Sequence, residues 1–365
     1  MSDHADTITM ECRVCFFQCY YTEYIRSQTL LEGLHQHEVN IAPCIVNQKS
    51  LFRYPKAIYK LLKVLKDTDV IVANFRCWEL LPLLRIITRK PIIYDAHISI
   101  WQSYCEERKK CKTKSIIGKL LYFIDRYNCR IADMVIVDTK THAQYFSRTF
   151  GVPIQKLLPV YISCEASRFR PRTPPGFHSD GVTRVFWAGS GIPLQGLEVI
   201  MDAMKLLGDF PIHLRIAGSS PIIERMKSKA KAENIYCISF LGRVTRDSVI
   251  EEIASADICL GGHYSSIPKA RNVIAGKLYE MIAMKKPVIA GDSPAVRELF
   301  TSGKNILLCK MGEAQSLADA ILTLHNQPEL RAAIASEAYN LYNTTLNPRQ
   351  ITSALADAIR LAAGK

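Results

Sequence analysis

The stretch IPKARNVIAGKLYEMIAMKKPVIAGDSPAVRELF, residues 267–300, joins a basic segment, a helix, an apolar strand and a turn into one unit. The spacing predicts a helix that carries Lys277 and Glu280 on one face, because residues three apart are neighbours there. An apolar strand at residues 287–290 follows, and a Gly-Asp-Ser-Pro turn comes next. A cation near the start of a helix and a carboxylate on the same face can hold an anion and a hydroxyl-rich ligand together.

Apolar runs of the parallel-sheet type recur along the chain before this stretch. Between them lie segments with apolar residues at helical spacing, such as residues 51–66 and 197–207. One such helix is predicted to end near Gly33. The alternation predicts an α/β protein whose parallel sheets are covered by helices on both faces. The expected strands are residues 13–18, 69–74, 90–99, 132–139 and 157–163, then 184–190, 213–219, 238–242, 257–262 and 286–291.

The pattern starts again after a segment rich in proline and glycine, so we expect two doubly wound domains. Their predicted bounds are residues 1–170 and 182–345, with a linker at 171–181. The tail is rich in Ala and Leu, and we expect a final helix at 346–365 that either stays with the second domain or crosses back to the first. Ligands of open α/β sheets bind at the carboxyl ends of the strands. The two domains are therefore expected to face a shared cleft.

Composition narrows the class of protein. The chain has 365 residues, of which 48% are hydrophobic and 22% charged, which excludes a disordered chain. The start of the chain lacks a secretory pattern, and no apolar run is long enough to span a bilayer, so we expect a cytoplasmic protein. The net charge of +13 suits nucleic acid, anionic lipid or phosphorylated ligands. Nucleic acid fits poorly, because the basic residues are not interleaved with stacking aromatics.

Twelve cysteines raise the question of metal sites and disulfides. Cys12 and Cys15 form a Cys-x-x-Cys pair on the first predicted strand, where residues an odd number apart point to opposite faces. We therefore expect buried reduced thiols rather than metal ligands or disulfides, and no metal site.

Residues 105–127, CEERKKCKTKSIIGKLLYFIDRY, begin with a basic cluster and continue as an amphipathic helix. The segment fits a peripheral contact with anionic lipid on the inner face of the membrane. We favour a solvated surface helix over the lipid contact, because lysine-rich helices of soluble proteins have the same composition.

The turn GSGIPLQG, residues 189–196, lies between a predicted strand and a predicted helix. Glycine at 189 and 191 lets backbone N–H groups approach a ligand at the positive end of the helix dipole. A tight turn between a strand and a helix also needs glycine for structural reasons alone.

Several motifs together resemble glycosyltransferase family 4, the glycosyl transferases group 1. They are FWAGSGIPLQGLEVIMDAMKLL, FLGRV, SADICLGG and NVIAGKLYEMIAMKKPVIAGDSPAVRELF in the second half, with YDAHIS and ADMVIVDTKTHAQYF in the first. The resemblance implies a GT-B fold, in which two Rossmann-like domains face a central cleft. It also implies a retaining enzyme that uses a nucleotide-sugar donor as substrate and needs neither metal nor cofactor.

The resemblance assigns roles by position. Glu280 matches the second glutamate of an E-x7-E motif, which holds the ribose, while Asn272 stands where the first glutamate contacts the donor sugar. Ser190 and Gln195 stand where an arginine and a lysine hold the diphosphate. The residues that remain to hold the diphosphate are Gly189, Gly191, Lys269, Arg271 and Lys277.

Two further residues match the family. His97 resembles a cleft histidine that contacts the transferred sugar, and the alternative is a partly buried histidine bonded to backbone. Glu298 matches a glutamate that follows the nucleotide loop, and the alternative is a charge on a helix surface.

We therefore expect a glycosyltransferase that moves a hexose-type sugar from a nucleoside diphosphate to a hydroxyl of a glycan or lipid-linked acceptor, as in the synthesis of cell-surface glycans or glycolipids. In that reading Asn272, Lys277 and His97 act at the reacting centre. The departures at Ser190, Gln195 and Asn272 keep a second hypothesis open, a silent GT-B scaffold that binds sugar or a partner. A nucleotide-sugar epimerase is a more distant alternative.

Overall fold

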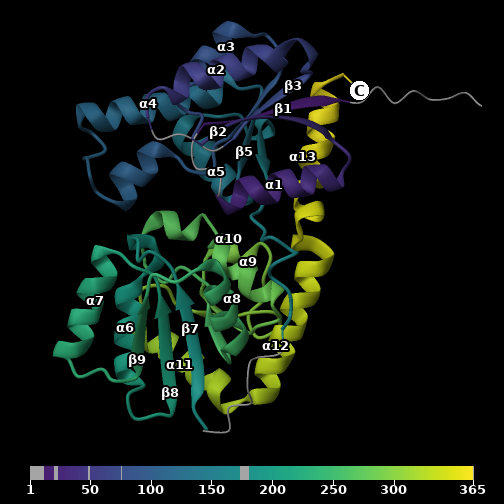
Figure 1. The fold of residues 1–365 in the computed structure, drawn as a ribbon. Helices are drawn as coiled ribbons and strands as arrows, with labels where there is room; N and C mark the ends of the chain where they lie inside the picture. The colour runs from purple at the N-terminus through teal and green to yellow at the C-terminus, as the bar shows by residue number, and fades with distance from the viewer. Residues whose placement is uncertain (1–11, 20–23, 48–49, 75, 173–180, 365) are drawn as a thin grey trace, which may run out of the picture.

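Two parallel sheets of six strands each organise the part of the chain that the structure describes, residues 12–19, 24–47, 50–74, 76–172 and 181–364 of a computed structural model (Figure 1). The strand orders are β2-β1-β3-β4-β5-β6 and β12-β11-β10-β7-β8-β9. Helices cover both faces of each sheet, and the two domains face each other. This is the doubly wound GT-B architecture that the motifs imply, so the predicted fold class is confirmed.

The elements of the N-terminal domain follow in chain order. They are β1 (Arg13–Cys19), α1 (Ile25–Gln36), β2 (Asn40–Val46), α2 (Arg53–Val64), η1 (Leu65–Asp67), β3 (Val70–Ala73), α3 (Leu81–Ile87), β4 (Ile92–Asp95), η2 (Gln102–Glu107), α4 (Ile116–Ile131), β5 (Met134–Val137), α5 (Lys140–Phe150), η3 (Ile154–Lys156) and β6 (Leu157–Pro159). Four of these strands, β3 to β6, are shorter than the apolar runs that predicted them, whereas β1 continues one residue further, to Cys19.

The second half of the chain begins with β7 and, after its last strand, ends in four helical segments. Its elements are β7 (Thr183–Ala188), η4 (Pro193–Gln195), α6 (Leu197–Leu206), β8 (Ile212–Ala217), α7 (Pro221–Ala232), β9 (Ile238–Gly242), α8 (Arg246–Ser255), β10 (Ile258–Leu260), η5 (Pro268–Arg271), α9 (Gly276–Ala283), β11 (Val288–Gly291), α10 (Pro294–Arg297), β12 (Leu307–Cys309), α11 (Ala314–Asn326), α12 (Pro328–Leu341), η6 (Tyr342–Leu346) and α13 (Pro348–Ala362). Most of the predicted linker, residues 173–180, lies outside the described residues.

The last helix, α13, packs on the N-terminal domain. Ile351, Leu355 and Ile359 join the apolar layer that covers one face of β1 and β3. Figure 1 shows α12 beside the C-terminal domain and α13 beside the N-terminal domain. One apolar face of the N-terminal sheet is thus completed by residues of the last helix, far away in the sequence.

This packing corrects the predicted end of the first helix. α1 continues past Gly33 to Gln36. A Cβ atom at position 33 would lie 2.2 Å from the carbonyl oxygen of Pro348 and 2.3 Å from Oγ1 of Thr352. Glycine is present here because two helices cross closely, and not because the helix stops.

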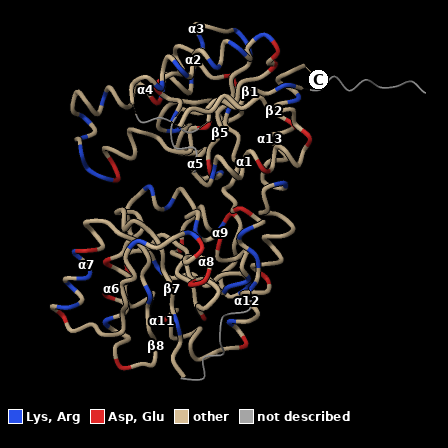
Figure 2. Tube along the Cα trace, in the orientation of Figure 1, with Lys and Arg blue, Asp and Glu red and all other residues tan. Residues whose placement is uncertain are grey.

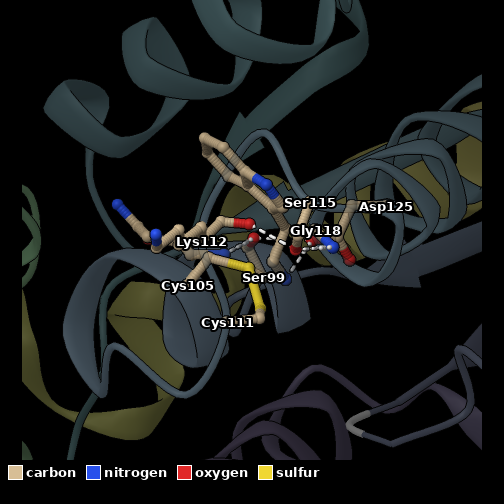
Figure 3. Close-up of a disulfide and its surroundings, with 9 residues drawn as sticks. Ser99, Cys105, Cys111, Lys112, Ser115, Gly118 and Asp125 are labelled. Atoms are coloured by element: carbon tan, nitrogen blue, oxygen red, sulfur yellow. Dashed lines mark hydrogen bonds between the residues drawn. A yellow bond between two sulfur atoms is a disulfide. The ribbon is translucent and has the colours of Figure 1, made fainter.

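The cysteines differ from the expectation at one pair. Cys105 and Cys111 form a disulfide, with their Cα atoms 4.8 Å apart, which falls in the usual range for a bonded pair (Figure 3). The π-helical turn η2 and the following turn bring the two residues together, an arrangement that spacing alone did not indicate. Most of the other cysteines are buried, as predicted.

Candidate functional site

The site lies where the strand order of the C-terminal sheet reverses. The chain runs from β7 outward through β8 and β9, then returns to place β10 on the other side of β7. The segments that leave β7 and β10 therefore diverge at the carboxyl edge of the sheet, where ligands of such folds bind. The first segment carries the glycine turn after β7, and the second leads through η5 to α9.

The turn after β7 is held from within by Gln195. Gly191 adopts a left-handed conformation, with φ of 69°, and its N–H donates to Oε1 of Gln195 at 2.8 Å. The backbone oxygen of Ser190 accepts from Ser220 Oγ at 2.7 Å. Gln195 was predicted to stand in a diphosphate-binding position, and here it orders the backbone of that turn. The Gly191 amide, expected to help bind phosphate, is engaged by Gln195 in this structure.

Lys277 reaches the end of β7 from the start of α9. Its Nζ donates to the Ala188 carbonyl at 2.9 Å and lies 4.1 Å from the centre of the Trp187 ring. Burial lowers the pKa of Lys277 to about 7, while Glu280 opposes the change. Its Nζ is thus placed at the end of β7, next to Gly189 of the glycine turn.

Glu280 lies one helical turn after Lys277 and forms an ion pair that the sequence did not reveal. Its Oε1 accepts from Arg246 at 3.1 Å, and Arg246 also approaches Glu165 at 3.7 Å. Burial raises the pKa of Glu280, and Arg246 opposes that change. Arg246 is the first residue of α8 and lies two residues after the FLGRV motif. Its position beside this motif was the sequence signal that could have identified Arg246 as a site residue.

Lys269 is paired across the domain boundary. Its Nζ donates to Oε2 of Glu107 at 2.6 Å and to Oγ of Ser103 at 2.8 Å, and both residues belong to η2 of the N-terminal domain. The ion pair is almost completely buried. Lys269 was predicted to bind phosphate, but its charge is already neutralised by a carboxylate in this structure. Its observed contact holds the two domains together.

Asn272 and Arg271 lie on the same segment, at the end of η5. The backbone oxygen of Asn272 accepts from Thr139 Oγ1 at 2.6 Å, which is a second contact between the domains. The side chain of Arg271 is exposed and lines neither of the cleft cavities described below. The structure thus brings Lys277 to the glycine turn but places Arg271 outside the cavities.

His97 lies just after β4, buried on the N-terminal side of the cleft. Its Nδ1 is 3.5 Å from an oxygen of Asp95, and its ring stacks on Tyr24 at 5.4 Å between centres. Asp95 is held in turn by Arg26 at 2.9 Å. Burial alone would raise the pKa of Asp95, but Arg26 outweighs it and holds that pKa below its ordinary value.

Glu298 joins the domains at the start of α5. Its carboxylate accepts from the backbone N–H groups of Lys140 and Thr141 at 2.8 and 2.6 Å, and from the Tyr161 hydroxyl at 2.9 Å. A carboxylate is favoured at the first amides of a helix. Glu298 was predicted to contact the nucleotide, whereas all these partners lie before residue 170 and make it an interdomain contact.

Two adjoining cavities lie between the domains. The smaller one, about 220 Å³, is lined by residues of both domains that include His97, Asp138, Gln195, His263, Lys269 and Lys277. The larger one, about 490 Å³, lies mainly against the N-terminal domain, and its lining includes Tyr24, Trp78, Tyr94, Tyr104, Arg108 and Ser190. Aromatic and charged side chains around a concave space suit a polar ligand with ring faces. Within the described residues, no group of three metal-ligating side chains is arranged to hold an ion.

Comparisons with known proteins agree with this geometry. Residues 183–327, which contain the glycine turn, Lys277 and Glu280, match the family described as glycosyl transferases group 1. The chain is 23% identical over 177 residues to an uncharacterized glycosyltransferase of Methanocaldococcus jannaschii, covering 47% of this chain and 48% of that protein. It is 29% identical over 187 residues to a phosphatidyl-myo-inositol mannosyltransferase of Mycobacterium leprae, covering 48% of this chain and 46% of that protein. The aligned regions span about half of these two relatives.

A solved structure shares the whole architecture. HepE of Anabaena, in complex with UDP, superposes with a TM-score of 0.72 at 18% identity, covering 96% of this chain and all of that chain. At this identity the likeness establishes the fold. The resemblance to group 1 glycosyltransferases is thus confirmed for residues 183–327, and the GT-B fold for the chain as described.

Proposed function

We propose that this chain, a GT-B protein with a group 1 glycosyltransferase match over residues 183–327, transfers a hexose-type sugar from a nucleoside diphosphate to an acceptor hydroxyl. We further propose that it belongs to family 4 and retains the anomeric configuration. One observation carries the proposal. Lys277 reaches the glycine turn after β7, at the edge of a cavity that both domains line. Lys277 and the glycine turn both lie within the matched region.

The proposed donor site uses the C-terminal domain. The diphosphate lies against the turn at Gly189 and Gly191, where Lys277 supplies the positive charge that stabilises the leaving group. Glu280 accepts hydrogen bonds from two ribose hydroxyls, which suits a carboxylate with two oxygens. Arg246 holds Glu280 in place, so ribose binding and the ion pair share one carboxylate.

The proposed sugar site lies between the two domains, and the proposed acceptor site lies on the N-terminal side. Asn272 and His97 face the transferred sugar, and the larger cavity receives the glycan or lipid-linked acceptor. In a same-face displacement the acceptor hydroxyl attacks as the diphosphate leaves. The protein then contributes positioning and charge stabilisation, without a metal or a cofactor. We propose a role in the synthesis of surface glycans or glycolipids for this reaction.

A silent scaffold remains the second candidate, because specific contacts favour it. Gln195 engages the Gly191 amide, and Glu107 neutralises Lys269, so fewer groups are available to a diphosphate than the motifs suggested. Such a protein would bind a nucleotide sugar or a partner without turning it over.

The first test measures donor binding. UDP, GDP and ADP and their common sugars are screened by thermal shift and calorimetry with wild type, Glu280→Ala and the control Glu252→Ala. Glu252 is matched because it also pairs with an arginine, Arg215 at 2.5 Å, and it lines neither cleft cavity. A ligand that binds the folded state raises its melting temperature.

We expect one nucleotide class to stabilise wild type and Glu252→Ala. Glu280→Ala should bind it roughly ten- to a hundredfold more weakly, because hydrogen bonds to a charged group are lost. Equal binding by all three proteins would remove the ribose role of Glu280. Binding without any hydrolysis or transfer would favour the scaffold, and binding of no nucleotide would refute the donor site.

A further inference from the structure

The helix α4 buries one face against the N-terminal domain and exposes an apolar stripe on the opposite face. Its inner face is held by Asp125, which accepts a hydrogen bond from Ser99 Oγ at 2.6 Å (Figure 3). Asp125 also accepts from the Trp101 N–H at 2.9 Å. The opposite face carries large apolar side chains at spacings of four, three and four residues, which form one stripe along a helix. The exposed stripe consists of Ile116, Leu120, Phe123 and Tyr127.

The exposure of the stripe is large. Ile116 is 87% exposed, Phe123 is 60% exposed and Leu120 is 56% exposed. Phe123 and Tyr127 stack on each other at 5.9 Å between ring centres, so they form a continuous apolar surface. Isolated exposed apolar residues are ordinary, but an aligned stripe of this kind marks an interaction surface. The hydrogen bonds of Asp125 hold the inner face of α4 against the domain, so the stripe on the opposite face stays exposed to solvent.

Exposed positive charge borders the stripe. The exposed basic residues of the segment before α4 and of α4 itself are Arg108, Lys109, Lys110, Lys112, Lys114, Lys119, Arg126 and Arg130. Between residues 108 and 131 the one acidic residue is Asp125, which is buried. Figure 2 shows the basic residues along α4 and the segment that leads into it. This surface, residues 108–130, thus combines apolar area with charge of one sign.

The basic segment is fixed against the first turn of α4. Ser115 accepts from the Gly118 N–H at 3.1 Å and donates to the Lys112 carbonyl at 2.6 Å (Figure 3). A Cβ atom at Gly118 would lie 2.4 Å from that same carbonyl, so the two segments touch. The disulfide Cys105–Cys111 ties the start of the segment to η2. The lysines and the apolar stripe therefore belong to one surface.

We propose that residues 108–130 dock on an anionic lipid bilayer, with the apolar stripe inserted at the level of the headgroups and the basic residues against lipid phosphates. Charge complementarity selects this occupant, because a membrane of anionic lipid offers both an apolar interior and a dense negative surface. A second copy of the chain offers the same positive charge and would repel. Among the described residues no helix is long and apolar enough to cross a bilayer, so the contact is peripheral.

The surface borders the larger cavity of the cleft. Tyr104 and Arg108 line that cavity, and Lys110 Nζ lies 5.5 Å from the centre of the Tyr104 ring. This step rests on the proposed function: a docked molecule would meet an acceptor that is anchored in the bilayer. Vesicle binding itself needs no donor and no transfer, so it can fail or succeed independently of the proposed reaction.

The test is co-sedimentation of the full chain with vesicles, either pure phosphatidylcholine or phosphatidylcholine with about one third phosphatidylglycerol. One variant joins Leu120→Ser and Phe123→Ser, and a second replaces Lys110, Lys112 and Lys114 by Gln. The control for the apolar change is Leu206→Ser on the C-terminal domain, where the leucine is 51% exposed. The control for the charge change is Lys227→Gln with Lys231→Gln, exposed lysines of α7.

We expect wild type and both controls to bind the anionic vesicles and to be released by salt. The apolar variant should bind at least tenfold more weakly, and the charge variant about a hundredfold more weakly. Circular dichroism confirms that each variant is folded. Equal binding to neutral vesicles, or variants that bind as wild type does, would overturn the proposal. A wild-type dimer that Leu120→Ser dissociates would assign the stripe to a second copy instead.

Discussion

The depressed pKa of Lys277 predicts that donor affinity depends on pH. Burial lowers this pKa to about 7, far below the ordinary value of a lysine, so the free protein carries the charge below pH 7 and loses it above. A bound diphosphate needs the charged form and raises the pKa again. Each unit of pH above 7 therefore weakens binding about tenfold, because the protein must first take up a proton.

The magnitude follows from that value. With a pKa of about 7 in the free protein and a charged lysine in the complex, the apparent Kd of a nucleotide sugar rises about ninetyfold from pH 6 to pH 9. The assay is calorimetry with the nucleotide sugar that the screen identifies, since its diphosphate does not titrate in this range. Lys277→Met should bind weakly and show no such slope.

The matched control is Lys286→Met. Lys286 is also half-buried, its Nζ donates to the carbonyls of Ala254 and Ala256, and burial lowers its pKa too, but it lines neither cleft cavity. Lys286→Met should keep the slope of wild type. An affinity of wild type that is constant between pH 6 and 9 would refute the reasoning, as would a slope that persists in Lys277→Met.

The same shift bears on stability. Lys277 has a lower pKa in the folded protein than in the unfolded chain. Between pH 7 and the pKa of the unfolded chain, the unfolded state therefore binds more protons at this residue than the folded state. This residue therefore makes the folded state more stable as the pH rises through that window. Lys277→Met should remove that contribution, and thermal unfolding at pH 6 and pH 9 measures it.

Two other predictions concern the domain interface and the buried acids. Glu298→Ala should lower the free energy of unfolding by about 1–3 kcal/mol, since it leaves two helix amides and the Tyr161 hydroxyl without their carboxylate. The control Glu337→Ala, at an exposed glutamate, should change that free energy little. Equal urea midpoints for the two variants would contradict this prediction. Arg26→Met should destabilise by about 3–5 kcal/mol at neutral pH, because it removes the guanidinium that pairs with the buried Asp95 and Asp138. The loss should shrink in acid as the carboxylates protonate, and a loss that does not change with pH would refute the ion-pair account.

The sequence by itself determined the class of fold. Apolar runs at β1, β3 and β4 predicted buried parallel strands, because a strand covered on both faces has no polar side. The glycine turn and the helix with Lys277 and Glu280 were also visible, since each lies within one local segment. Helix and strand periodicity depends on neighbours in the chain, so one sequence suffices to read it.

The tertiary structure decided which charges are available and which are already paired. Lys269 with Glu107, Glu280 with Arg246 and Asn272 with Thr139 join segments far apart in the chain. The exposure of the stripe on α4 was equally undecided, because the spacing of its apolar residues would also fit a buried face. Such contacts depend on how two domains pack, and no local pattern encodes the side chain that will stand opposite a given residue.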